Sequence, residues 1–216
     1  IPGPSLKGAL RHQIESYLID RYYDTRNNRW PDRYRALQPC MAGAGRISQE
    51  EAELVRAGKY RSTGDRYEQS GCKYDRSDYP ICPVCYLLGA QGLVGFVQVP
   101  FLAAEQRADA LYAGRVDRAK GTIAAGTNRP YELVRDGIRF TGTLRILMQD
   151  DVRGWTFGQP RYLTENWSPD QWLEASEWDT ERILKELIIS RLEAIGVIGG
   201  YRSKGFGKIK VTVTGG

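Results

Sequence analysis

Apolar residues recur at helical spacing in two segments of the chain. In the segment that begins near Ser5 they are Leu6, Leu10, Ile14, Tyr17 and Leu18. In the segment from Thr180 to Gly196 they are Leu184, Leu187, Ile188, Leu192 and Ile195. Steps of three or four residues place such side chains on one face of an α-helix. The pattern predicts two amphipathic helices, the first capped by Ser5 and the second ended by Gly196.

Three other segments alternate apolar and polar residues with the period of two that is typical of β-strands. They span residues 94–103, 138–148 and 208–214 and are rich in β-branched and aromatic side chains. The predicted order is therefore helix, strand, strand, helix, strand. One strand before Ile1 would complete the β-α-β-β-α-β order of a ferredoxin-like (RRM-like) fold. We expect an α+β fold and an N-terminally incomplete segment.

Two long stretches interrupt this pattern, at about residues 20–80 and at residues 104–136. Connections of this length usually carry function or are disordered. The first includes the run DRYYDTRNNRWPDRYR, whose arginines and tyrosines suit phosphate pairing and base stacking. A solvated insertion would have the same composition. In the second, Arg115, Arg118, Lys120 and Arg129 outnumber the nearby acidic residues.

Composition narrows the class of protein. The chain has 216 residues, of which 41% are hydrophobic, and this supports one folded domain with large insertions. It contains no run of about 20 apolar residues and no signal-peptide pattern, so we expect a cytoplasmic protein without a membrane partner. The net charge of +5 permits an anionic partner.

A glycine-rich stretch near the end reads GVIGGYRSKGFGKIKV. Gly200 and Gly205 have the G-x4-G spacing of a P-loop, but Phe206 stands where that motif needs lysine, and a strand is expected to follow. The dinucleotide-binding fingerprint is also incomplete. The remaining interpretation is a nest of backbone amides with Arg202 and Lys204, which can accept the phosphates of a polymer. A turn that merely needs glycine is the structural alternative.

The cysteines suggest a metal site. Cys82 and Cys85 form a C-x2-C pair, and Cys72 precedes them at a distance that a returning loop can span. In a cytosolic chain such thiols favour metal binding over disulfides, and zinc is the natural metal for them. A redox role for the C-x2-C pair is the alternative. Cys40 is one candidate for the fourth ligand.

Four stretches together resemble one known family. IPGPSLKGALR, CPVCYLLGAQG, VDRAKGTIAAGTNRPYELV and GGYRSKGFGKIKV occur in the order seen in RAMP-superfamily proteins. The chain resembles, more narrowly, a backbone subunit or one domain of a fused backbone from a type III CRISPR effector complex. The resemblance implies a single RAMP domain over residues 1–216. Its palm would comprise residues 1–20, 90–103 and 137–216, with an insertion at 21–89 and a thumb at 104–136.

The resemblance also implies the partners: a CRISPR guide RNA, a target RNA cleaved at regular intervals, and neighbouring RAMP subunits or domains. The start of the first helix can take a phosphate, and two of its cations share a face. The RNA-binding residues implied are Ser5, Lys7, Arg11, Arg115, Arg118, Lys120, Arg129, Tyr201, Arg202, Ser203 and Lys204.

For the metal site, the resemblance implies zinc held by Cys72, Cys82 and Cys85, with His12 as the fourth ligand and Cys40 as its competitor. In the family, target cleavage depends on an acidic residue in a loop before the IPG motif, acting with magnesium or manganese. We interpret Asp117 and Asp136 as partners of nearby arginines rather than as catalytic groups. We therefore expect the segment by itself not to cut RNA.

Two alternatives remain open. RAMP-type endoribonucleases that process guide RNA share this fold, and many use a histidine as a general acid or base. His12, the only histidine, could serve that role. The other alternative is a zinc-stabilised general RNA-binding module, which rests on charge and fold alone.

Overall fold

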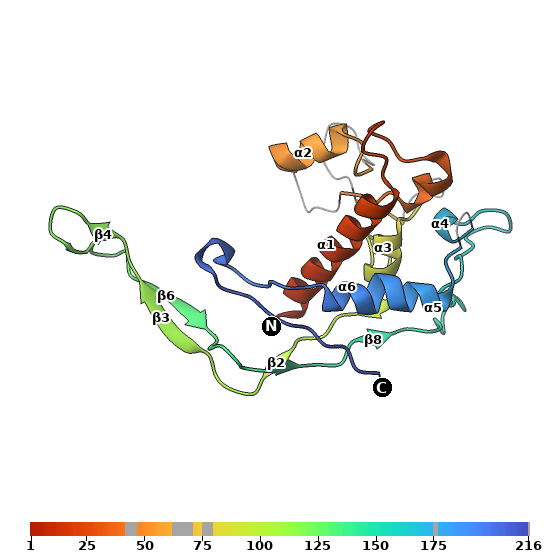
Figure 1. Cartoon of the computed structure of the whole chain (residues 1–216). Coiled ribbons are helices and arrows are strands. Elements are labelled where there is room, and N and C mark those ends of the chain that lie inside the picture. Colours follow the sequence, from red (N-terminus) through yellow and green to blue (C-terminus); the bar gives the residue numbers. More distant parts are fainter. Residues whose placement is uncertain (42–46, 62–70, 75–79, 175–176, 216) are drawn as a thin grey trace. The chain divides into compact units, whose positions relative to one another are not determined.

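A computed structural model describes residues 1–41, 47–61, 71–74, 80–174 and 177–215 (Figure 1). The chain divides into two compact units. Unit 1 comprises Ile1–Gly3 and Pro100–Thr143, and unit 2 comprises Pro4–Val99 and Leu144–Gly216. No helix of the described part combines the length and apolar character needed to cross a membrane.

The fold mixes helices with small antiparallel sheets. The helical elements are α1 (Gly3–Tyr22), η1 (Asp32–Leu37), α2 (Gln49–Arg56), α3 (Pro83–Leu88), α4 (Gln171–Glu174), α5 (Thr180–Arg182), η3 (Ile183–Ile189), α6 (Ser190–Glu193) and η4 (Arg202–Lys204). The paired strands are β1 (Val97–Gln98) with β8 (Arg145–Ile146), β2 (Ala103–Ala104) with β7 (Phe140–Thr141), β3 (Asp109–Ala113) with β6 (Arg129–Leu133), and β4 (Val116–Asp117) with β5 (Thr122–Ile123).

The first predicted helix is present as α1. Four of its apolar residues are buried in unit 2: Leu6, Leu10, Ile14 and Leu18. The predicted cap is wrong, because the helix begins at Gly3 and Ser5 lies within its exposed first turns. Pro4 fits this earlier start, since the missing N–H of a proline loses no hydrogen bond in the first helical turn.

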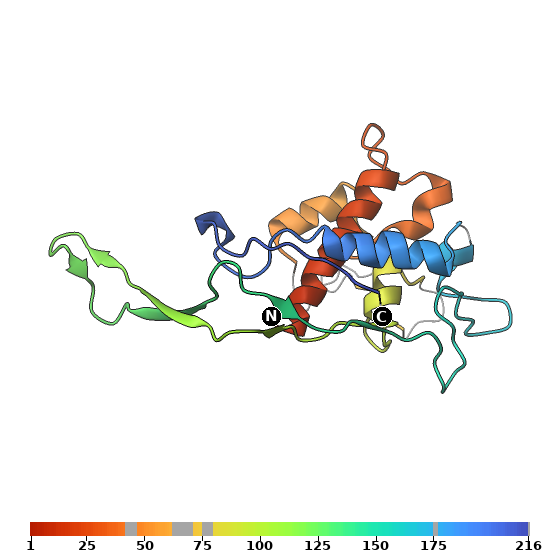
Figure 2. The same cartoon turned by 60° about the horizontal axis from the view of Figure 1, so that its bottom comes forward.

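The second predicted helix is also present and runs through α5, η3 and α6 without a break (Figures 1 and 2). Asp179 caps its start by accepting a hydrogen bond from the backbone N–H of Arg182 at 2.7 Å. Its middle segment, η3, is a π-helix, whose wider turn shifts the phase of the buried face. Ile183 is therefore buried, whereas Leu184, a predicted core residue, is only half-buried.

The core of unit 2 gathers around α3, whose six residues are all buried. The ring of Tyr86 lies 4.8 Å from Phe96 and 5.3 Å from Trp172, between centroids. Its hydroxyl accepts a hydrogen bond from the backbone N–H of Gly158 at 2.9 Å. A buried tyrosine needs such a partner for its polar end. Tyr86 therefore links α3 to β1 and to the segment that follows β8.

A buried ion pair holds another part of this core. Arg161 and Asp170 have side chains only 2% and 0% exposed, and their two hydrogen bonds are each 2.6 Å long. Asp170 also accepts the backbone N–H of Arg161. The guanidinium lies 4.6 Å from the ring centroid of Tyr86. The pair thus pins the 161–170 loop onto the aromatic core.

The predicted strands are shorter in the structure than the alternation suggested. Residues 94–103 contribute only β1 and the first residue of β2, and residues 138–148 contribute only β7 and β8. No strand is present in 208–214; Lys208 instead forms an isolated bridge with Val197. Alternation of apolar and polar residues gives a segment one apolar face. A strand also needs backbone hydrogen bonds to a neighbouring strand, and residues 208–214 form no such ladder within the described part of the chain.

Unit 1 consists mainly of a long β-hairpin, drawn in green in Figure 1. In the β3–β6 pair, Leu111 lies opposite Tyr131 and Tyr112 lies opposite Pro130. Beyond this pair the hairpin continues into β4 and β5. The residues of the predicted thumb, 104–136, all lie within this unit.

Candidate functional site

Four buried cysteines form a cluster in unit 2. The sulfur atoms of Cys40, Cys72, Cys82 and Cys85 all lie within 4.8 Å of one another. Cys40 Sγ is 3.4 Å from Cys85 Sγ and 3.7 Å from Cys82 Sγ. A tetrahedral zinc with Zn–S bonds of about 2.3 Å separates its sulfurs by about 3.8 Å. The four thiols therefore fit a structural zinc ion, and these distances are too long for disulfides.

Local structure explains why the sulfurs converge. Cys82 is the N-cap of α3, and Cys85 lies in its first turn. Cys40 is held by a parallel bridge to Arg61. Cys72 precedes Lys73, which bridges to Gln91 just beyond α3. Three separate stretches of chain thus meet at the start of α3.

Hydrogen bonds surround the sulfurs. The backbone N–H of Cys72 donates to Cys40 Sγ, and that of Cys82 donates to Cys72 Sγ, both at 3.4 Å. Hydrogen bonds with the other cysteines, Cys40 first, lower the pKa of the Cys72 thiol, and the charge of Arg61 acts in the same direction. At Cys72 these contacts favour the thiolate, the form of cysteine that binds metal.

The structure brings together the three cysteines of the predicted zinc site, and the fourth member of the cluster is Cys40 rather than His12. His12 is exposed on α1 and lies outside the cluster. Cys40 could have been preferred from the sequence on one ground: it is the only cysteine besides the three already assigned. The resemblance favoured a histidine on the first helix, and that helix turns a different residue, Arg11, toward the sulfurs.

The glycine-rich loop follows α6 and folds back on itself. Its ends are joined by a hydrogen bond from the Ile198 N–H to the Gly207 carbonyl at 2.8 Å. Gly199 and Gly205 have φ values of 91° and 85°, which side-chain-bearing residues rarely adopt. A Cβ on Gly207 would lie 2.1 Å from the carbonyl oxygen of Ile198. Gly199, Gly205 and Gly207 are therefore required by the path of the loop, as expected for a turn that needs glycine.

Replacing Gly207 by alanine is expected to open this loop. The residue has φ of 82°, and its Cβ would collide with backbone, so the variant should lose at least about 1 to 2 kcal/mol of stability. Gly200→Ala is the matched control, because Gly200 has open space around it. Denaturant unfolding of both variants checks the expectation. Equal unfolding midpoints would contradict it.

The same loop exposes three side chains of the predicted RNA-binding set: Tyr201, Arg202 and Lys204. Arg202 Nε donates to the Gly199 carbonyl at 3.2 Å, and Lys204 Nζ lies 4.9 Å from the ring centroid of Tyr201. These contacts leave both cations at the surface. The backbone of Ser203 lies in η4 between them.

On α1, the predicted RNA contacts have different surroundings. Ser5 and Lys7 are exposed. Arg11 is mostly covered: its two terminal nitrogens lie 3.9 Å from Cys85 Sγ, and it pairs with Glu15 at 3.5 Å. Burial raises the pKa of Glu15 to about 7 despite the opposing charge of Arg11. Of these three residues, only Ser5 and Lys7 are therefore at the surface, where they could contact a phosphate.

The hairpin of unit 1 exposes the four cations assigned to RNA binding, Arg115, Arg118, Lys120 and Arg129. Asp117 Oδ1 accepts the backbone N–H groups of Ala119 and Lys120 and so shapes the turn between β4 and β5.

Asp136 likewise accepts the N–H of Gly137. Neither carboxylate forms an ion pair among the described residues, so the interpretation of Asp117 and Asp136 as arginine partners is wrong. Both stabilise turns.

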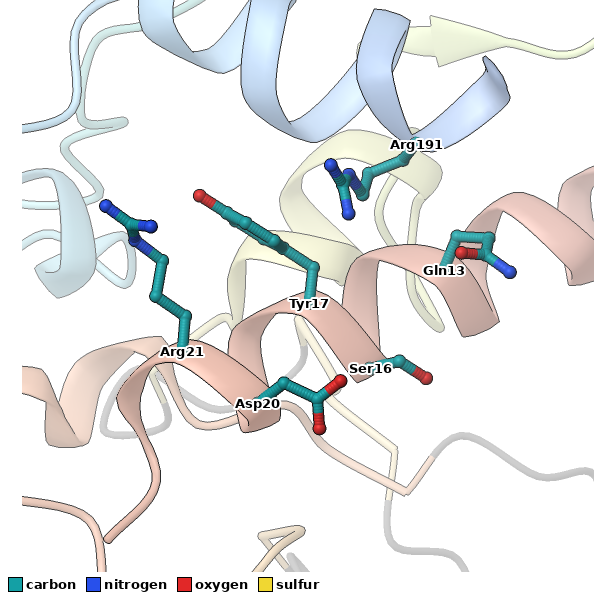
Figure 3. A pocket seen from close by; sticks show the side chains of 6 residues that line it. All are labelled: Gln13, Ser16, Tyr17, Asp20, Arg21 and Arg191. Atoms are coloured by element: carbon teal, nitrogen blue, oxygen red, sulfur yellow. The ribbon is translucent and has the colours of Figure 1, made fainter. Parts of the chain in front are cut away.

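A shallow pocket lies between α1 and α6 (Figure 3). The guanidinium of Arg191 lies 4.4 Å from the ring centroid of Tyr17, whose hydroxyl donates to Glu186. Burial raises the pKa of Tyr17, so its hydroxyl stays protonated at neutral pH. Asp20 is the one carboxylate among the lining residues. The pocket is therefore a polar contact between two helices, and its lining residues include no acid–base pair.

The chain belongs to the RAMP superfamily, whose family model matches residues 1–210. No curated protein matches the chain. Membership implies an RNA-binding function associated with CRISPR. The match spans both helices, the cysteine cluster, the hairpin of unit 1 and most of the residues after the glycine-rich loop.

Proposed function

We propose that this RAMP-superfamily chain is a guide-RNA-binding backbone component of a type III CRISPR effector, where it positions target RNA for regularly spaced cleavage. One observation carries most of the proposal: the family match covers residues 1–210 and so includes both the opening helix and the glycine-rich loop. Guide RNA, target RNA and neighbouring RAMP subunits or domains are the proposed partners. In this proposal, α1, the C-terminal helix and the β1–β8 pair belong to a ferredoxin-like palm.

The proposed RNA track follows the start of α1 and the glycine-rich loop. Lys7 on α1 and the glycine-rich loop both belong to unit 2, and both views draw the loop on the side where α1 begins (Figures 1 and 2). Lys7, Arg202 and Lys204 are exposed there. Cations on flexible side chains suit a phosphate backbone and leave the bases unread. Such contacts fit a guide whose sequence varies.

The thumb hairpin is proposed to insert between bases. It exposes large apolar side chains, with Tyr112 65%, Val116 60% and Ile123 59% exposed. An isolated two-stranded hairpin is marginally stable in water, so these side chains favour a partner surface. Its cations Arg115 and Lys120 would meet phosphates on either side of the wedge.

Zinc is the proposed metal of the four-cysteine cluster, with a structural role. Because the thiols come from three stretches of chain, a bound ion would tie them together and supply folding energy. We propose no magnesium or manganese site in this segment. A metal-dependent cleavage step would need clustered ligands, and among the described residues Asp117 and Asp136 belong to no group placed to hold a metal ion.

The phosphate track makes a quantitative prediction. Changing Lys7 and Arg202 together to glutamine should weaken single-stranded RNA binding and reduce the log–log salt slope by about 1.4, because each lost contact removes about 0.7. Lys185→Gln is the control, since Lys185 is an exposed cation elsewhere in unit 2. Filter binding at several salt concentrations measures both quantities. An unchanged affinity and slope would reject the assigned track.

A second candidate function rests on His12. This histidine is exposed and outside the cysteine cluster, so it is available for acid–base chemistry on a 2′-hydroxyl. A guide-processing nuclease should cut free guide precursor and lose that activity in His12→Ala. The backbone component should bind the precursor without cutting it. A zinc-stabilised general RNA-binding module should instead bind RNA without preference for guides.

A further inference from the structure

Two arginines approach the cysteine cluster from different elements. Arg61 NH2 donates to Cys72 Sγ at 3.1 Å and to the Pro80 carbonyl at 2.7 Å. Arg11 reaches Cys85 Sγ from α1 with both terminal nitrogens at 3.9 Å. The guanidinium groups therefore contact two different sulfurs. Neither contact follows from helical or strand periodicity.

Arg61 has no acidic partner among the described residues. It forms none of the ion pairs there, and its Nε is buried without a hydrogen-bond partner. Arg61 is half-buried, and a guanidinium removed from water in this way needs a compensating charge nearby. Among the described residues, the group in contact with it that can carry that charge is the Cys72 sulfur as a thiolate. The position of Arg61 is thus itself an indication that the cluster is anionic.

The net charge of a zinc-bound cluster would match the charge of the two arginines. Four thiolates and one Zn²⁺ sum to −2, and all four cysteines are at most 3% exposed. Water cannot solvate that charge, so it must be balanced by nearby cations. Arg61 and Arg11 supply two positive charges. Arg11 divides its interactions between Cys85 and Glu15, so Arg61 is the more complete partner.

We propose that Arg61 and Arg11 are positioning residues of a tetrathiolate zinc centre, each donating to a sulfur and together balancing its charge. The inference rests on the metal site of the proposed function. The proposal also gives Arg11 a role other than binding RNA. Arg11 would connect the metal centre to α1, and the first turns of that helix carry Lys7. Each such outer contact typically changes metal affinity by about 10- to 100-fold.

The test uses the full chain with Zn²⁺ and Co²⁺. Zinc affinity is measured by competition with a chromogenic chelator for Arg61→Gln, Arg11→Gln, Arg61→Lys and Arg11→Lys. Arg21→Gln, an exposed position on the same helix as Arg11, is the control. The sulfur-to-cobalt charge-transfer band of each variant reports whether four thiolates still bind. Circular dichroism of each metal-free variant reports whether it folds like the parent.

We expect about 10- to 100-fold weaker zinc affinity for Arg61→Gln, a smaller loss for Arg11→Gln, and partial rescue by lysine at either position. The cobalt band should keep its tetrathiolate form throughout. Equal affinities in the parent and the glutamine variants would overturn the inference while leaving the metal site intact. Equal losses with lysine and glutamine would overturn the charge-balancing role. A parent chain that binds no metal would refute the metal site itself.

Discussion

Changing Cys40 or Cys82 to serine is expected to abolish stoichiometric zinc binding and to unfold the part of unit 2 around α3. Structural zinc contributes about 10 to 16 kcal/mol in small metal-dependent domains, which is comparable to the whole stability of a typical domain. The four sulfurs lie within 4.8 Å and are buried, and among the described residues no fifth His, Cys, Asp or Glu side chain belongs to the group to replace a lost ligand. Metal analysis of the purified protein should find one zinc per parent chain.

His12→Ala is the matched control for these variants. Because His12 is exposed and outside the cluster, this variant should retain one zinc and the parental unfolding curve. Loss of zinc in His12→Ala, with full retention in Cys40→Ser, would reverse the assignment of the fourth ligand. Retention of zinc in all of them would mean that the metal lies elsewhere.

Changing Asp170 to alanine is expected to cost about 3 to 5 kcal/mol. The substitution leaves the Arg161 guanidinium buried at 2% exposure without its carboxylate, and it also removes the acceptor of the Arg161 backbone N–H. In a chain of this size the melting temperature should fall by roughly 6 to 20 °C. Differential scanning calorimetry at neutral pH measures the change.

Asp109→Ala provides the comparison, because it breaks an ion pair with Arg135 whose side chains are 45% and 75% exposed. Exposed pairs contribute about 0 to 1 kcal/mol, since water and salt screen them. The two variants should therefore differ severalfold. If Asp109→Ala destabilised the protein as much as Asp170→Ala does, burial would not explain the strength of the Arg161–Asp170 pair.

The helices were predictable because apolar residues recur in these segments at steps of three or four residues, the period of an α-helix. Leu10, Ile14 and Leu18 in α1 are all buried, as their spacing indicated. The π-helical segment was not predictable, since a wider turn depends on packing that periodicity does not encode. As a result, Ile183 is buried, whereas Leu184, which was expected in the core, is only half-buried.

Strands were less predictable than helices for a related reason. A helix satisfies its own backbone, whereas a strand requires a partner that lies far away in the sequence. Residues 208–214 alternate well, yet apart from the bridge of Lys208 to Val197 they form no ladder in the described structure.

The site was partly predictable as well. Cys82 and Cys85 were readable from their spacing, because a C-x2-C pair can serve one metal through local geometry alone. Cys40 and Arg61 meet the cluster through long-range pairing, which no local motif encodes. Arg11 was assigned to RNA from its place on a basic helix face, but its neighbours in space are sulfurs.

The central claim is that this chain holds a guide RNA along α1 and the glycine-rich loop. The most direct test is ultraviolet cross-linking of the full-length protein, co-produced with a guide array, followed by sequencing of the RNA and mass spectrometry of the peptides. The account predicts RNA of discrete guide length, with cross-links at the Lys7 region and at Tyr201–Lys204. RNA of heterogeneous length and origin, cross-linked outside both segments, would contradict it.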